Sequence, residues 1–346
     1  MSARDAARAG GPGGPRSPDS GDDQAVFVEA AARLHFGVLD LGGALGRWFC
    51  GIGAAAPAPS LLVSARPTQS LHVEGEDAER AADFARRFQT HFRITRGARV
   101  SVHRARPPHA GLGSGTQLAL AVARALSEIH GIDADASALA RAVGRGERSA
   151  IGTWTFAGGG LVVEGGRRPA REECGPLLAR LPFPPSWQCV LAVPDAIRGL
   201  HGADEAAAFA KLPPPPDRDA ERVAHLVLMA LLPALVESDL TTFGAALSEI
   251  QSITGRWFAP AQGATFAPGP AEELVRRMAE WGASGVGQSS WGPAVYGIVN
   301  GREAGVELAD RVRDLFARSG AGAVYEGPFH AEGARVWRTP VHTLLR

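Results

Sequence analysis

Three glycines at alternate positions, Gly111, Gly113 and Gly115, mark the stretch of the chain best suited to binding a ligand through its backbone. A backbone without side chains can curl tightly and approach a bound group closely. Apolar residues at helical spacing follow, so the turn leads directly into a helix. A helix N-terminus offers unpaired N–H groups and the positive end of its dipole, which suit a phosphate group. The candidate phosphate-binding loop comprises Gly111, Leu112, Gly113, Ser114, Gly115, Thr116 and Gln117.

Two familiar phosphate loops do not match this stretch. A Walker loop needs a lysine after its last glycine, and Lys211 is the only lysine in the chain. A Rossmann turn follows its strand directly and is followed about 20 positions later by an acidic residue that binds ribose. Here residues 104–110 separate the predicted strand 98–103 from the turn, and Asp133 and Asp135 fall in a loop. A glycine-rich turn that only permits close helix packing is the alternative explanation.

Polar residues also gather near the N-terminus, where Arg33, His35 and Asp40 accompany an apolar segment. Alternation predicts a strand over residues 25–36 that leads into a glycine-rich loop at 37–43. A histidine can move a proton or orient a polar group, and a carboxylate can bind a metal. An ion pair at the end of a strand is the alternative explanation for these residues.

The second half of the chain adds two further groups of candidates. Arg198 and His201 follow the buried strand predicted at 188–194, in a loop position where ligand contacts are common. An arginine there can hold a carboxylate or a phosphate through two parallel hydrogen bonds, although a solvated loop is the alternative. A second glycine-rich turn, 282–293, precedes a strand and contains three polar candidates: Gln288, Ser289 and Ser290.

Apolar periodicity predicts the elements that position these residues. Residues 76–92 are predicted to form an amphipathic helix, whose outward face carries Arg80, Arg86 and Arg87 and is most simply solvated. Residues 223–250 are predicted to form two helices broken near Pro233 and Asp239. The stretch 251–270 shows no clear period, and we expect it to be a flap over the active site.

Composition narrows the function classes. The chain has 346 residues, enough for two domains, with 45% apolar and 21% charged residues. Its formal net charge is zero, so it has no general attraction to nucleic acid or to anionic lipid. The three cysteines show no metal-binding spacing, and no apolar leader or membrane-spanning segment is visible. We therefore expect a cytoplasmic protein with no nucleic-acid or membrane partner and a disordered tail at residues 1–24.

The sequence around the first glycine turn resembles the GHMP kinase superfamily, whose phosphate loop reads Pro-x-x-x-Gly-Leu-Gly-Ser-Ser. Residues 107–114, Pro-Pro-His-Ala-Gly-Leu-Gly-Ser, fit that pattern. The Gly-Thr-Gln at 115–117 and the Gly-Gln-Ser-Ser at 287–290 resemble one branch, the β-ribofuranosylaminobenzene 5′-phosphate synthases. The resemblance implies a two-domain α+β GHMP kinase-like fold with its site between the domains. The N-terminal domain, 25–186, would be ribosomal protein S5 domain 2-like, and the C-terminal domain, 187–346, ferredoxin-like.

The resemblance also implies an activity in tetrahydromethanopterin biosynthesis. Such a transferase moves the phosphoribosyl group of phosphoribosyl pyrophosphate (PRPP) to the ring carbon of 4-hydroxybenzoate or 4-aminobenzoate, with release of CO₂ and pyrophosphate. Mg²⁺ is the implied cofactor, and a homodimer is compatible with the family. On this hypothesis the loop 111–117 and Arg33 bind phosphate, His35 acts as the base or orients the acceptor, and Asp40 binds Mg²⁺ or stabilises the sugar cation. Further substrate contacts are expected from Arg198, His201, Gln288, Ser289 and Ser290.

Two other functions stay open on the sequence. An ATP-dependent small-molecule kinase of the same superfamily would use a carboxylate to orient its hydroxyl nucleophile. The kinases carry an aspartate in the corresponding region, but this chain has no Asp or Glu between Ser149 and Val163. Trp154 and Phe156 in that segment are candidates for stacking on an aromatic acceptor, with buried packing as the alternative. A protein that only binds a sugar or nucleotide is the third possibility.

Overall fold

The computed structural model describes residues 24–106, 109–168, 173–195, 199 and 202–340. The predicted disordered tail lies outside the described residues, except for Gln24. Arg198 and His201, and the two prolines that open the first motif, also lie outside them. Among the described helices, none combines the length and the apolarity that crossing a bilayer would require.

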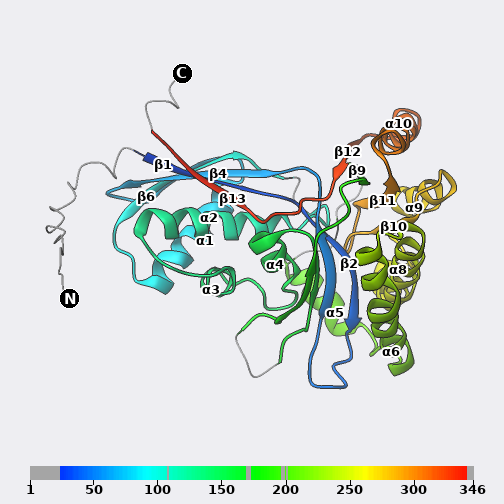
Figure 1. Ribbon diagram of the computed structural model, residues 1–346. Helices are drawn as coiled ribbons and strands as arrows, with labels where there is room; N and C mark the ends of the chain where they lie inside the picture. Colours follow the sequence, from blue (N-terminus) through cyan, green and yellow to red (C-terminus); the bar gives the residue numbers. More distant parts are fainter. Residues whose placement is uncertain (1–23, 107–108, 169–172, 196–198, 200–201, 341–346) are drawn as a thin grey trace, which may run out of the picture.

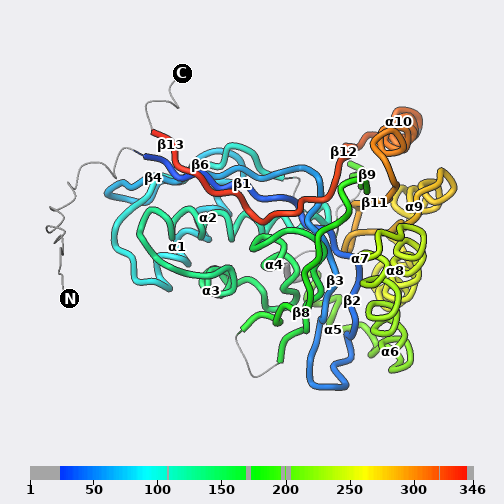
Figure 2. Tube along the Cα trace, in the orientation of Figure 1, coloured from blue at the N-terminus to red at the C-terminus, as the bar shows by residue number. Residues whose placement is uncertain are grey.

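The first sheet has the strand order β13-β1-β4-β6-β5, and α1 and α2 pack against one face of it (Figure 1). Valine and alanine side chains of β1, β4 and β6 meet the apolar faces of the two helices in one core. The last strand, β13, runs antiparallel beside β1, so the end of the chain returns to its beginning (Figure 2). The elements of this layer are β1 Gln24–Ala30, β4 Leu61–Thr68, β5 His72–Gly75, β6 Gly97–Arg104, β13 Arg335–Pro340, α1 Ala78–Phe92, α2 Ser114–His130 and α3 Ala136–Ala142.

The second sheet has the order β2-β3-β7-β8, with α4 packed against it. The strand predicted at 25–36 is in fact two strands in different sheets, because the chain changes sheets at residues 31–32. Directly after the change, the Arg33 N–H donates a hydrogen bond to the Leu112 carbonyl oxygen over 3.1 Å. The predicted loop 37–43 begins as the end of β2. These elements are β2 Arg33–Asp40, β3 Cys50–Ala55, β7 Leu161–Glu164, β8 Leu177–Leu181 and α4 Ile151–Gly158.

The third sheet has the order β10-β11-β9-β12 and is antiparallel throughout. Alternate residues of β9 enter two different cores: Leu191 faces the α6–α8 layer, and Val190 faces α9 and α10. This explains the continuous apolar run that predicted a buried strand at 188–194. Part of the predicted turn 282–293 is the strand β10. These elements are β9 Trp187–Pro194, β10 Gly285–Gln288, β11 Val295–Asn300, β12 Gly322–Pro328, α9 Pro270–Glu280 and α10 Arg302–Ser319.

A helical layer connects the second and third sheets, and two predictions about it are wrong. Pro233 does not break a helix, because it lies in the first turn of α7, where its missing N–H is not needed. Residues 251–262 are not a flap but the second half of α8, whose buried polar residues, Gln251 and Thr254, obscure the apolar period. The break near Asp239 is confirmed, since its carboxylate caps α8. The elements are α5 Gly202–Lys211, α6 Asp217–Leu226, a π-helix at Val227–Leu231, α7 Leu232–Glu237 and α8 Leu240–Gln262.

Candidate functional site

The first glycine-rich turn lies at the N-terminus of α2, where the sequence predicts it. Gly113 precedes the helix with a φ of 67°, and Gly111 has a φ of 78°, both in the left-handed region that favours glycine. A Cβ atom at Gly111 would lie 2.3 Å from the carbonyl oxygen of Ser289, so a larger residue does not fit. Ser289 Oγ donates a hydrogen bond to the Gly111 carbonyl oxygen over 2.7 Å. The turn is therefore held between β2 and the second glycine-rich turn.

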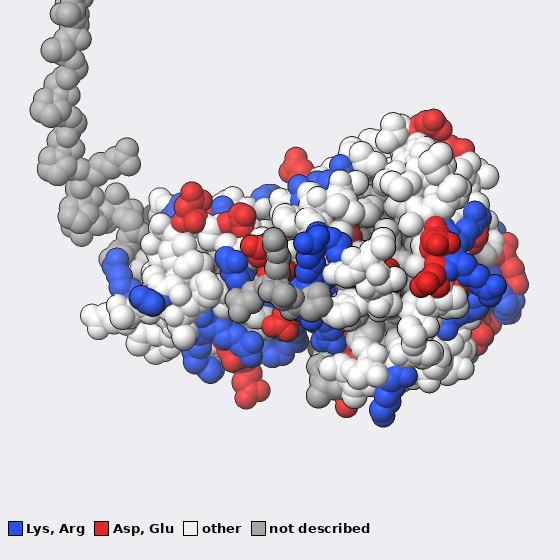
Figure 3. Space-filling model, turned by 90° about the horizontal axis from the view of Figure 1, so that it is seen from below, with Lys and Arg blue, Asp and Glu red and all other residues white. Residues whose placement is uncertain are grey.

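A cavity of about 430 Å³ opens at this helix start, and we call it the basic cleft. Arg33 reaches it from β2 and Arg80 from α1, while Arg145 and Arg148 come from the loop before α4. Glu205 of α5 is the single carboxylate among the described residues that line it. Basic side chains gather around the middle of the molecule in the view from below (Figure 3). The other lining residues are His109, Gly111, Leu112, Gly113, Ser114, Gly115, Thr116 and Ser290.

The guanidinium groups of the basic cleft are crowded and short of partners. Burial lowers the pKa of Arg145, and repulsion from neighbouring arginines, Arg80 first among them, lowers it further. Burial also lowers the pKa of Arg33 to about 10, although Glu205 opposes this shift. Three buried donor atoms have no hydrogen-bond partner within the described part of the chain: Arg33 Nε, Arg145 Nε and Arg148 Nη1. Because unpaired buried donors cost free energy, a bound anion would stabilise the cleft.

Sequence reasoning missed most of these arginines. Arg80 was expected on a solvated face, but it lines the cleft because α1 packs alongside α2. Arg145 and Arg148 lie in a glycine-containing loop without any period, and Glu205 lies in a separate helix. Nothing in the spacing of these residues distinguishes them from other charged surface positions, so only the tertiary structure identifies them.

A second, narrow pocket of about 20 Å³ adjoins the basic cleft, and the two share Ser290. Its described lining residues include no Arg, Lys, Asp or Glu. Gln251 is buried here: its Nε2 donates to the Phe36 carbonyl oxygen over 2.6 Å, and its Oε1 accepts from the Gln288 N–H over 2.9 Å. The lining residues are His35, Gly37, Gln251, Thr254, Gly255, Phe258, Gln262, Thr265, Phe266, Gln288 and Ser290.

His35 contributes a neutral imidazole to the narrow pocket. Burial lowers its pKa to about 3, and the nearby positive charge of Arg33 acts in the same direction. The His35 backbone N–H donates to Ser289 Oγ over 2.9 Å, which ties β2 to the second glycine-rich turn. A group with so low a pKa is a weak base at neutral pH, so its chemistry here is that of a hydrogen-bonding side chain.

The structure brings together most of the described residues predicted for the site. The turn and Arg33 line the basic cleft, His35 and Gln288 line the narrow pocket, and Ser290 lines both. Two further predicted residues, Ser289 and Gln117, line neither cavity but form hydrogen bonds that hold the neighbouring segments in place. Ser289 bridges β2 and the turn. Gln117 in the first turn of α2 is buried, and its Nε2 donates to the Gly152 carbonyl oxygen over 2.7 Å.

Asp40 is not brought to either cavity. It lies at the end of β2, where its Oδ1 accepts from the N–H groups of Gly42 and Gly43 over 2.6 and 3.0 Å. The described residues contain no group of three His, Cys, Asp or Glu side chains that could hold a metal ion. The geometry around Asp40 is that of a turn-forming carboxylate, and its predicted role in metal binding stays a prediction.

The aromatic residues proposed for stacking also lie apart from the two cavities. Phe156 is buried in the core of the first sheet. Trp154 Nε1 donates to the carbonyl oxygen of Gly175 over 2.8 Å. Packing, the alternative explanation, therefore accounts for both side chains.

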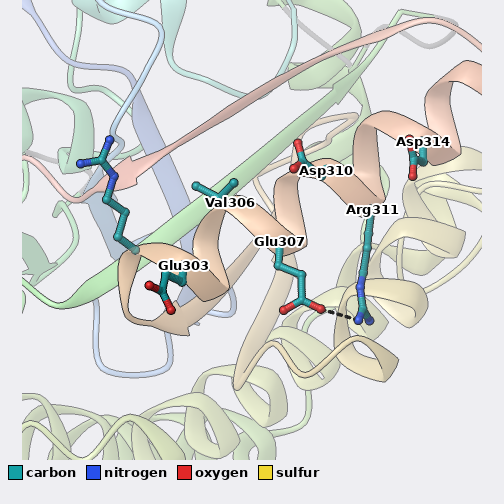
Figure 4. A pocket seen from close by; sticks show the side chains of 7 residues that line it. Glu303, Val306, Glu307, Asp310, Arg311 and Asp314 are labelled. Carbon is teal, nitrogen blue, oxygen red and sulfur yellow. Dashed lines mark hydrogen bonds and ion pairs between the residues drawn. The ribbon is translucent and has the colours of Figure 1, made fainter.

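A third hollow, of about 500 Å³, lies along one face of α10 and differs in charge from the basic cleft. Figure 4 shows its side chains projecting from successive turns of this single helix, with Glu307 joined to Arg311. Four of the lining residues are acidic and two are basic, so an anion would meet net repulsion there. The lining residues are Arg302, Glu303, Val306, Glu307, Asp310, Arg311 and Asp314.

Comparison with known proteins agrees with this geometry. The GHMP kinases N terminal domain model matches residues 78–159, and the GHMP kinases C terminal model matches residues 231–318. A β-ribofuranosylphenol 5′-phosphate synthase from Archaeoglobus fulgidus is 36% identical over 304 residues, covering 85% of this chain and 93% of that protein. A synthase of the same name from Methanothermobacter thermautotrophicus is 34% identical over 297 residues, covering 80% and 89%.

The solved structures share the fold. Homoserine kinase from Cytophaga hutchinsonii superposes with a TM-score of 0.70 at 17% identity, covering 93% of this chain and 100% of that one. At that identity the likeness shows the fold alone. Together with the two domain models, it confirms the α+β GHMP kinase-like fold predicted from the sequence.

Proposed function

Because the chain belongs to the β-ribofuranosylphenol 5′-phosphate synthase family of the GHMP kinase superfamily, we propose that it is a decarboxylating pentosyltransferase. Its donor would be PRPP, and its acceptor the ring carbon of a 4-substituted benzoate. The observation that carries the proposal is the basic cleft, where buried arginine donors without partners surround a helix N-terminus. A donor with two phosphate-containing ends supplies the anionic groups that such a cleft requires.

The names of the relatives favour one acceptor. Loss of the carboxylate from 4-hydroxybenzoate leaves a phenol, whereas its loss from 4-aminobenzoate leaves an aniline. The relatives are named for a phenol product. We therefore propose 4-hydroxybenzoate as the acceptor, with 4-aminobenzoate as the competing candidate in the test below.

The reaction exchanges bonds at two carbons. The bond between the anomeric carbon and the pyrophosphate oxygen breaks, and its electron pair leaves with pyrophosphate. The ring carbon that bears the carboxylate then bonds to the anomeric carbon, driven by electron donation from the hydroxyl group opposite it. The bond to the carboxylate breaks last: its electron pair restores the aromatic ring and CO₂ departs. The phenol product keeps its hydroxyl proton, and the negative charge of the carboxylate is balanced by the charge that leaves with pyrophosphate.

We place the acceptor in the narrow pocket, next to Ser290. The absence of a cation among its described lining residues supports this placement, because a guanidinium group would hold the carboxylate that must leave as CO₂. His35 would form a hydrogen bond with the benzoate in its neutral form, which favours orientation of the acceptor, one of the two roles expected from the sequence, over that of the base. A hollow of about 20 Å³ is smaller than a benzoate ring, so acceptor binding must widen it.

We propose that Mg²⁺ binds together with the donor PRPP. Mg²⁺ is commonly held by one or two carboxylates together with the phosphates of a substrate. Glu205 is the carboxylate that the cleft offers among its described residues, while Asp40 is engaged with neighbouring N–H groups. Bound there, the ion would supply additional positive charge next to the phosphates.

A release assay tests the proposal. The purified protein is incubated with PRPP and Mg²⁺, and with 4-hydroxybenzoate or 4-aminobenzoate in turn, while pyrophosphate release is followed. We expect release that depends on the acceptor, faster with 4-hydroxybenzoate. Absence of release with both acceptors, together with ADP formation from ATP and a small alcohol, would instead identify the protein as a kinase of the superfamily.

A further inference from the structure

We infer that Arg80, Arg145 and Arg148, which we call the arginine triad, bind the pyrophosphate group of the donor. This inference rests on the proposed function and assigns one end of its substrate to three residues that the sequence analysis did not select. The triad combines residues from α1 and from the loop before α4 at one end of α2. Arg33, which lies beside Gly113 and not beside Gly115, is not part of it.

Two members of the triad lie directly over the first turn of α2. A Cβ atom built at Gly115 would lie 2.6 Å from Arg80 Nη2 and 3.4 Å from Arg145 Nη2. The guanidinium groups therefore occupy the space beside the first N–H groups of the helix, which have no acceptor within the helix. An anion at this position would meet backbone donors and side-chain donors together. A side chain at Gly115 would meet the end of the Arg80 side chain, which would then have to shift.

Each arginine is held in place by a contact that leaves donors available. Arg145 lies over the ring of Phe84 on α1, with Cζ 4.9 Å from the ring centroid. Arg80 Nη1 pairs with Asp77 over 2.8 Å. Arg148 Nη2 pairs with Glu205 over 3.0 Å. Arg145 Nε and Arg148 Nη1 are nevertheless buried without a hydrogen-bond partner among the described residues. The side chains of the triad are therefore held in place, while two of their donor atoms stay unpaired.

Repulsion from neighbouring cations indicates the charge of the ligand. Burial is the largest cause of the lowered pKa of Arg145, and the positive charges of Arg80, Arg87 and Arg148 lower it further, so this guanidinium group lies in strongly positive surroundings. On α10, in contrast to Arg145, Arg311 and Arg313 pair with carboxylates one helical turn away. A diphosphate can place oxygen atoms against several guanidinium groups at once, whereas a monophosphate offers fewer. The triad is therefore suited to the pyrophosphate end of PRPP.

This placement would help the reaction as well as binding. Negative charge accumulates on the pyrophosphate oxygen as its bond to the anomeric carbon breaks. Cationic donors that are already in position stabilise that charge without reorganising. Loss of a triad member is therefore expected to lower kcat as well as to raise the KM for PRPP.

Calorimetric titration of the purified protein with inorganic pyrophosphate and with inorganic phosphate tests the triad. Arg145→Gln and Arg80→Gln are each expected to weaken pyrophosphate binding by about 10- to 100-fold, the loss typical of one charge-assisted contact. The preference of the wild-type protein for pyrophosphate over phosphate should shrink in both variants. Arg86→Gln is the matched control: Arg86 lies on the exposed face of α1 and does not line the cleft. Its pyrophosphate affinity should change by less than about threefold.

Three results would overturn the inference: unchanged pyrophosphate affinity in both triad variants, an equal loss in Arg86→Gln, or an equal loss for phosphate and pyrophosphate. Circular dichroism and the melting temperature establish that each variant is folded. The titration contains no benzoate, so it measures pyrophosphate binding by the triad independently of the reaction. Weakened pyrophosphate binding without CO₂ release from any benzoate would support the triad and contradict the synthase, and the converse would contradict the triad alone.

Discussion

The basic cleft gathers four guanidinium groups around one helix N-terminus, whereas the narrow pocket beside it is lined by amides, hydroxyls and aromatic rings. Ser290 borders both. The contrast suggests a division of labour in which strong positive charge holds a phosphorylated donor and a neutral wall holds the acceptor. Separating the two would keep the arginines from stabilising the acceptor carboxylate, which has to leave. The predictions below test each side of this comparison.

The largest loss of stability and activity is expected at Gly111, where the first glycine-rich turn contacts the second. Gly111→Ala would bring a Cβ atom within 2.3 Å of the Ser289 carbonyl oxygen and force a left-handed alanine. The left-handed conformation costs about 1–2 kcal/mol, and the clash adds about 1–3 kcal/mol of overpacking. Gly131→Ala is the control, because Gly131 has a similar φ of 66° and no atom within 4 Å of its Cβ position. Urea unfolding should show the larger loss for Gly111→Ala, with loss of pyrophosphate release, and equal losses would contradict the account.

The next effect concerns the wall of the narrow pocket. Gln251→Ala removes two buried hydrogen bonds, to the Phe36 carbonyl oxygen and from the Gln288 N–H. We expect a destabilisation of about 1–3 kcal/mol and a rise in the KM for the benzoate, with the KM for PRPP nearly unchanged. Gln89→Ala is the control, since its amide makes an exposed contact to Arg96. If the KM for PRPP rose instead, the pocket would belong to the donor.

A pH-dependent effect is expected from His35. Its pKa is about 3 in the folded protein, below the 6.5 of an unperturbed histidine, so the unfolded chain takes up the proton first as the pH falls below 6.5. At pH 5 this should cost the wild-type protein about 2 kcal/mol of stability that His35→Gln does not lose. The difference in unfolding free energy between the two proteins, measured in urea at pH 7 and pH 5, checks this. A difference that does not change with pH would mean that the imidazole is solvated.

The smallest effect is expected at Glu205. This carboxylate pairs with Arg148 and raises the pKa of Arg33, so it competes with an anion for the basic cleft. In the absence of Mg²⁺, Glu205→Gln should bind pyrophosphate about two- to fivefold more tightly, the scale of one partly exposed ion pair. Weaker binding under the same conditions would show that Glu205 supports the anion site and does not oppose it.

Local chemistry made one part of the site predictable. The glycine spacing and the apolar period after it predict the turn 111–117 and α2, because left-handed glycines and a helix start leave a local signature. The continuous apolar run at 188–194 predicts β9, and the motif resemblance predicts the fold. These features depend on residues that are neighbours in the sequence.

The remaining parts of the site depend on packing between distant segments. Arg80 has the spacing of a solvated position and reaches the cleft only because α1 lies against α2. Gln251 is a polar residue that interrupts the apolar period of α8, although it is buried. Its burial is possible because it forms hydrogen bonds with β2 and β10, and these distant contacts cannot be predicted from the local sequence. The contacts of Asp40 were also not predictable from its residue type: its carboxylate accepts hydrogen bonds from the two N–H groups of the following turn, while its role in metal binding stays a prediction.

The stoichiometry of CO₂ and pyrophosphate in a single incubation tests whether the protein transfers the phosphoribosyl group of PRPP to a benzoate with loss of its carboxylate. The protein is supplied with PRPP, Mg²⁺ and 4-hydroxybenzoate labelled in its carboxyl carbon, and both products are counted together. The account predicts one labelled CO₂ for each pyrophosphate, and neither product without the acceptor. Pyrophosphate without labelled CO₂, or turnover only when ATP is added, would contradict the assignment of donor and acceptor to the two cavities.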